Sequence, residues 1–94
     1  MINVSNCNTQ AAKLEAAATN LGSVIERYET AVDYLSKNSS TATQSYINEM
    51  NTKIESLTNL KKNLNLNAGI IREKARSIYN QEQKEQEAKE SQSE

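Results

Sequence analysis

The fold of this chain follows from the stretch INEMNTKIESLTNLKKNLNLNAGIIREKARSI at residues 47–78. Apolar residues recur there at alternating steps of three and four, which places them on one stripe of a helix. Residues 14–35 repeat the same spacing. The members of the two stripes are Leu14, Ala18, Leu21, Ile25, Tyr28, Val32 and Leu35, and then Ile47, Met50, Ile54, Leu57, Lys61, Leu64, Ala68, Ile71, Ala75 and Ile78. Two helices with one apolar seam each predict an all-α antiparallel two-helix hairpin that pairs into a four-helix bundle.

The ends of both helices carry capping signals. Ser5 and Asn6 are favourable N-caps, so the first helix is predicted over about residues 7–37. Polar residues that hydrogen-bond locally follow at 38–42 and predict the hairpin turn. Thr41 with Gln44 three positions later has the form of a capping box and starts the second helix.

The second helix is predicted over about residues 43–82, because no breaker interrupts it. Residues 1–82 thus form one helical hairpin domain. The remaining stretch, 83–94, holds Gln, Glu, Lys and Ser with one alanine, and it is predicted to be a polar, disordered tail. Counting evenly from the turn pairs Leu14 with Leu64 and Leu66, so the second helix is expected to outlast the first. The residues expected to project beyond the first helix are Ala75, Ile78 and Tyr79.

Composition predicts a hairpin that needs a partner. Leu, Ile and Val number only 17 of the 94 residues, and Phe and Trp are absent. Such a thin core is stabilised by association. The net charge of −1 gives no general attraction for nucleic acid or for an anionic membrane. No leader-like or membrane-spanning segment is apparent, so we expect a cytoplasmic protein that, if exported, leaves by a leaderless route.

The chemistry of catalysis is missing from the chain. There is no histidine, the single Cys7 has no partner base, and no phosphate-binding or metal-spaced motif occurs. The sequence therefore predicts a protein that is not an enzyme and has no catalytic, cofactor-binding or metal-binding residues. Cys7 has two open interpretations, a packed small side chain or an intermolecular disulfide.

Three further features each allow two interpretations. Gly22 interrupts a helix, either tolerated or because the neighbouring helix approaches closely. Lys61 in the seam either fixes a partner through a carboxylate, or snorkels while Leu60 fills the gap. A basic bias at residues 61–76 is either a solvated face or a docking strip for an acidic partner. Its charged members are Lys61, Lys62, Arg72, Lys74 and Arg76 against Glu73 alone.

The layout resembles the WXG (ESAT-like) superfamily of small helical-hairpin proteins. The resemblance lies in the lead Ile2-Asn3-Val4, the run Leu14-x-x-Ala17-x-x-x-Leu21, the polar turn, and the closing Ile71-x-x-x-Ala75-x-x-x-Tyr79 before acidic residues. It covers about residues 2–82. The family's Trp-x-Gly is absent from the turn, which reads NSSTAT at residues 38–43 and points to the divergent hairpins that accompany LXG toxins of Gram-positive bacteria.

The resemblance implies a non-enzymatic partner, targeting factor or small secreted substrate of type VII secretion, which binds a helical segment of a larger toxin or a second small hairpin protein. The family's export motif places an acidic residue four positions after an aromatic; here Gln83 stands there, and Tyr79 with Glu82 is the nearest match. The seam predicts a core and partner interface formed by Leu14, Leu21, Ile25, Tyr28, Leu57, Leu64, Ile71 and Ile78. The alternatives are a self-assembling structural hairpin, including a homodimer, and a cytoplasmic regulator that docks through a helix.

Overall fold

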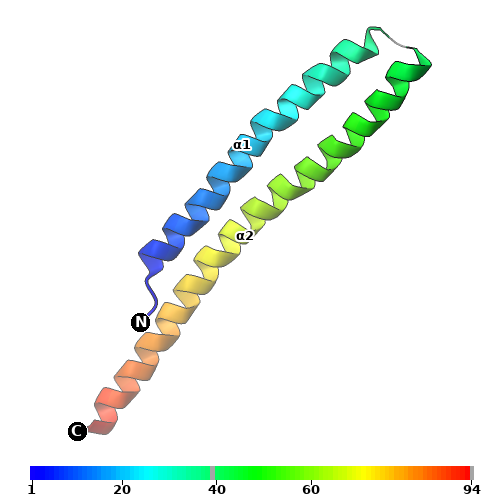
Figure 1. The fold of residues 1–94 in the computed structure, drawn as a ribbon. Coiled ribbons are helices and arrows are strands. Elements are labelled where there is room, and N and C mark those ends of the chain that lie inside the picture. Colours follow the sequence, from blue (N-terminus) through cyan, green and yellow to red (C-terminus); the bar gives the residue numbers. More distant parts are fainter. Residues whose placement is uncertain (39, 94) are drawn as a thin grey trace.

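The computed structural model describes residues 1–38 and 40–93 and contains two helices, α1 (Val4–Ser36) and α2 (Thr41–Ser93). They run antiparallel along each other, and the end of α2 extends past the N-terminus (Figure 1). The molecule measures 81 × 16 × 10 Å. At a rise of about 1.5 Å per residue, α2 alone accounts for that length. The predicted all-α antiparallel hairpin is confirmed.

Each helix begins with a side-chain cap, in each case earlier than predicted. Asn3 caps α1, and its side-chain oxygen accepts a hydrogen bond of 2.9 Å from the Asn6 amide. Before α2, the Ser40 hydroxyl accepts from the Thr43 amide at 3.2 Å, while the Ser40 amide donates to the Thr43 hydroxyl. This reciprocal pair is a capping box in which threonine replaces the usual Glu or Gln. Ser39 of the predicted turn lies outside the described residues.

The second helix also continues further than predicted. Residues 83–93, expected to form a disordered tail, are the last eleven residues of α2. Gln, Glu, Lys and Ala are strong helix formers, and residues 83–91 are exposed, so the helix continues there without packing on α1. Glu94 of the predicted tail lies outside the described residues.

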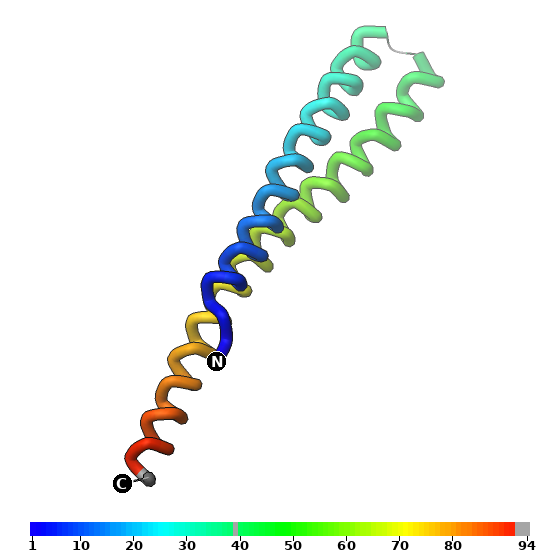
Figure 2. Tube along the Cα trace, turned by 60° about the vertical axis from the view of Figure 1, so that its left-hand side comes forward, coloured from blue at the N-terminus to red at the C-terminus, as the bar shows by residue number. Residues whose placement is uncertain are grey.

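The core between the helices is thin and graded in size. Among the described residues, the buried apolar side chains are Ala11, Ala18, Ile25, Ile47, Ala68 and Ala75. The alanines lie toward the N-terminal end of α1, and the isoleucines lie nearer the turn. Because interaxial distance depends on the side chains in contact, the helices lie close at the alanine end and further apart toward the turn, as both views show (Figures 1 and 2).

The longitudinal register differs from the predicted one by about one heptad, the seven-residue repeat of such seams. Glu15 pairs with Arg72, and the Ile2 amide reaches Glu82. Ala75, expected to project beyond the first helix, is only 2% exposed. Side chains tilt toward the N-terminus of their own helix, so contacting residues of an antiparallel pair do not come from the same height. The first helix also begins at Val4, three residues earlier than predicted, and therefore covers more of α2.

Candidate partner interface

The two helices face each other through positions that repeat every seven residues. On α1 these facing positions are 11, 18, 25 and 32; on α2 they are 47, 54, 61, 68, 75 and 82. In an antiparallel pair, positions three residues after a facing position turn to one side of the hairpin on both helices, and positions four residues after it turn to the other side. The Glu15–Arg72 ion pair joins two positions of the second kind. Tyr28 and Leu57, which line one shallow hollow, are of the first kind.

One side of the hairpin is consequently apolar along its whole length. We call it the apolar face; its members are Leu14, Leu21, Tyr28, Leu35, Met50, Leu57, Leu64, Ile71 and Ile78. All are half-buried by the hairpin except Ile78, which is 41% exposed. Their outer edges meet no other part of the described chain, so the hairpin alone leaves much of this surface in water.

Most of the predicted interface residues gather on this face. Seven of the eight belong to it, while Ile25, at 8% exposure, lies between the helices and contributes to the hairpin seam. The prediction missed Val24 and Leu60, which are 39% and 48% exposed and lie three residues beyond the members of the face. The sequence carried no clear signal for them, because Leu60 shares this offset on α2 with Lys53, Asn67 and Lys74.

The opposite side of the hairpin is formed by the positions one and four residues after the facing positions, and we call it the charged face. It carries an ion pair between the helices. Arg72 Nη2 donates to Glu15 Oε1 at 2.6 Å, and this hydrogen bond lowers the pKa of Glu15 below its ordinary value of 4.5. The same contact raises the pKa of Arg72. Both side chains are more than a third exposed, so water screens the pair and its main effect is to orient the helices.

Lys61 and Gly22 also meet on the charged face. A Cβ added to Gly22 would lie 3.0 Å from Lys61 Nζ, so the glycine leaves room for the lysine side chain of α2. The interpretation in which Leu60 fills the place of Lys61 in the seam is wrong, because Leu60 is 48% exposed. Within the described part of the chain, Lys61 makes no ion pair. A glycine in a helix interior destabilises the helix by about 1 kcal/mol relative to alanine, and at position 22 its missing side chain makes room for the ammonium group of Lys61.

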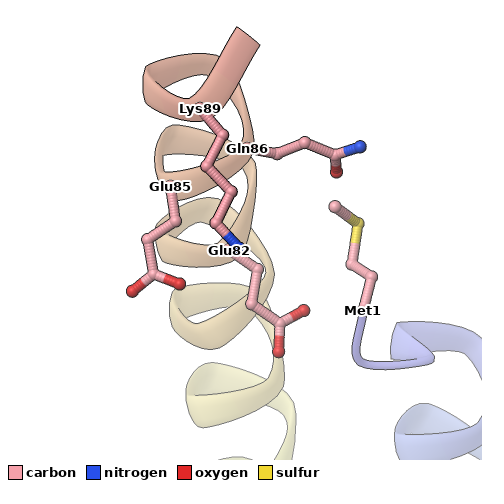
Figure 3. Close-up of a pocket in the computed structure, with 5 residues that line it drawn as sticks. All are labelled: Met1, Glu82, Glu85, Gln86 and Lys89. Atoms are coloured by element: carbon pink, nitrogen blue, oxygen red, sulfur yellow. The ribbon is translucent and has the colours of Figure 1, made fainter. Parts of the chain in front are cut away.

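Tyr79 and Glu82 lie near the end of the hairpin, where the chain's own N-terminal lead reaches α2. The Ile2 amide donates to Glu82 Oε2 at 2.6 Å, and Gln83 Nε2 donates to the Tyr79 hydroxyl at 2.9 Å. Met1 extends past Glu82 toward Gln86, and these residues line a shallow hollow with Glu85 and Lys89 (Figure 3). Tyr79 and Glu82 are both half-buried. No sequence pattern indicated the contact with Ile2, because it depends on the path of the lead.

The described residues contain no cluster of three or more His, Cys, Asp or Glu side chains that could hold a metal ion. Cys7 is a free, half-buried thiol. In the same part of the chain, no helix is long and apolar enough to cross a membrane. What the molecule presents instead is extended surface, apolar on one side and charged on the other.

Comparison with models of known protein families, with curated proteins and with solved structures finds no match to this chain.

Proposed function

We propose that this protein is a non-enzymatic binding partner that packs an α-helical segment of a larger protein against its apolar face. The apolar face is the observation that carries the proposal. Full burial of a large apolar side chain is worth about 1.5–3 kcal/mol, so each half-buried member retains on the order of 1 kcal/mol to be gained by covering it. Part of that gain offsets the entropy lost on association. A continuous stripe along both helices matches the shape of one or two partner helices.

The resemblance to the WXG superfamily suggests the biological setting. In this setting the protein is a partner, targeting factor or small substrate of type VII secretion, and it accompanies a cargo such as an LXG toxin from the cytoplasm. Tyr79 and Glu82 then lie at the end of the hairpin that meets the secretion machinery. The extension of α2 over residues 83–91 adds further polar helix surface beside them.

The first experiment purifies the tagged full-length chain from its native cells and determines the mass of the complex. A photoreactive residue replaces Leu57 on the apolar face or, as the matched control, the exposed Asn63, which lies two residues after the facing position 61 and points away from both faces. A larger protein crosslinked from position 57 and not from position 63 supports the proposal. Crosslinked homo-oligomers from position 57 favour the self-assembling structural hairpin, and a monomer without crosslinks overturns partner binding.

A second experiment separates export from binding. Ile78→Glu alters the apolar face near its end, whereas Tyr79→Glu alters the neighbouring position on the other side of the hairpin. We expect Ile78→Glu to weaken partner binding and export together, and Tyr79→Glu to reduce export while the complex still forms. Unchanged binding and export in both variants contradict the proposed role.

A further inference from the structure

The charged face carries a row of cations that the proposed function does not use. Lys61, Lys62, Arg72 and Arg76 lie on this side of α2, and we call them the basic strip. Lys62 and Arg76 directly follow the facing positions 61 and 75, whereas Lys74 of the same basic stretch turns toward the other side of the helix. Arg72 and Arg76 line a shallow hollow with Glu73, Ser77 and Asn80.

The strip has more positive charge than the hairpin neutralises. Glu15 is bound to Arg72, and Glu73 lies at the edge of the hollow. The other carboxylates on this side of the hairpin lie nearer the turn than the strip; they are Glu26, Glu29, Asp33 and Glu55. In the part of the chain that the structure describes, no salt bridge joins Lys61, Lys62 or Arg76 to a carboxylate of the hairpin. The whole chain has a net charge of −1, so this positive excess is local.

Both glycines of the chain lie on this same face. Gly22 of α1 is covered by the Lys61 side chain, as described above. Gly69 of α2 lies midway between Lys62 and Arg76, seven residues from each, and nothing lies within 4 Å of where its Cβ would be. Gly69 weakens its helix, and no contact within the hairpin explains it. It does leave a bare stretch of helix backbone between two cations about 10 Å away on either side.

We propose that the basic strip docks an acidic helical segment of a partner protein, distinct from the helix bound on the apolar face. Charge complementarity selects the occupant: carboxylates spaced along a helix meet Lys62 and Arg76, while Gly69 lets the two backbones approach closely between them. Lys61 supplies a third cation at one end of the contact. The overall negative charge of the chain works against nucleic acid and anionic membranes as alternative occupants.

The test measures binding of the full-length chain to a fluorescein-labelled, alanine-based helical peptide with glutamates three and four residues apart; its control has glutamine in their place. Fluorescence anisotropy at low salt reports affinity. We expect Lys62→Glu/Arg76→Glu to weaken binding by roughly tenfold or more, since two attractive contacts become repulsive. The matched control Lys53→Glu/Lys74→Glu makes the same change in net charge off the strip and leaves the affinity unchanged.

Gly69→Leu tests the close approach without altering any charge. Leucine is a better helix former than glycine, so the variant folds, yet its side chain covers the bare stretch. We expect it to weaken peptide binding by roughly fivefold, because a side chain replaces the open contact. A purely conformational role for Gly69 predicts no loss of binding.

Several results overturn the proposal. These are equal binding of the glutamate and glutamine peptides, equal losses in the strip and control double variants, unchanged binding by Gly69→Leu, and binding of duplex DNA as tight as that of the peptide. Leu57→Glu/Leu64→Glu on the apolar face leaves peptide binding intact if the two surfaces act separately. Failure of the basic strip and failure of the apolar face are therefore distinguishable.

Discussion

Gly22 and Gly69 allow a quantitative prediction because both lie in helix interiors. Only Gly22 has a side chain, that of Lys61, next to the place where a Cβ would be. Glycine to alanine in a helix interior stabilises by about 0.5–1 kcal/mol. Nothing lies within 4 Å of the Cβ position at Gly69, so Gly69→Ala gains the full amount. For a domain of this size, the gain raises the melting temperature by about 3–6 °C.

Gly22→Ala has the same intrinsic gain and a local cost. The new Cβ lies 3.0 Å from Lys61 Nζ and 3.6 Å from its Cε, so the lysine side chain must move off α1. Because that side chain is flexible, the cost is small, and we expect about half the gain of Gly69→Ala. In a Lys61→Ala background the neighbour is absent, and the two glycine substitutions become equal.

Thermal unfolding followed by far-UV circular dichroism, with all variants at one protein concentration, measures these differences. The double-mutant cycle between positions 22 and 61 isolates the contact energy. Two results refute the reasoning: no stabilisation by Gly69→Ala, or a larger gain for Gly22→Ala than for Gly69→Ala in the background that keeps Lys61.

Three further predictions concern the seam, the ion pair and the N-terminal lead. Ile47→Ala empties a site that is 7% exposed and lowers the free energy of unfolding by about 2 kcal/mol, measured by urea denaturation; an unchanged midpoint contradicts the burial. Because Arg72 lowers the pKa of folded Glu15, the pair stabilises the fold above about pH 4.5, and this stabilisation is lost as the pH falls through the lowered pKa. The difference in unfolding free energy between wild type and Glu15→Gln therefore vanishes in acid. A difference that does not depend on pH refutes the link. Ile2→Pro removes the amide that donates to Glu82, whereas the control Ile2→Val keeps it. We expect faster amide hydrogen exchange in the first turn of α1 in Ile2→Pro than in Ile2→Val. Equal exchange rates show that the contact does not stabilise this turn.

Apolar spacing was enough to predict the hairpin, because a four-and-three repeat defines a helix face over many turns. It did not set the alignment of the helices along each other, since a shift by a whole heptad preserves every face. The observed alignment depends on side-chain tilt at contacts such as Glu15–Arg72. Counting residues from the turn ignores this tilt.

The surfaces were predictable only in part, for a related reason. All nine members of the apolar face belong to the apolar stripes of the sequence, but only seven of them were predicted as interface residues. Leu35 and Met50 were left out of that prediction. The role of Gly22 required knowing that the side chain of Lys61 lies over it. Local propensity also misplaced the N-cap of α1 and the capping box of α2, because Asn3 and Ser40 compete with equally suitable residues nearby.

The grading of the seam from alanine to isoleucine has a mechanical consequence. Residue 2 lies beside residue 82, so a pull that separates the N-terminal lead from the free end of α2 opens the hairpin like a zipper. Load then falls on one turn at a time, beginning where contacts are made by the small side chains of Ala11 and Ala75. The hairpin therefore opens at low force when its two ends are pulled apart. It resists a higher force when one helix is pulled along the other, because that motion strains all contacts of the seam at once.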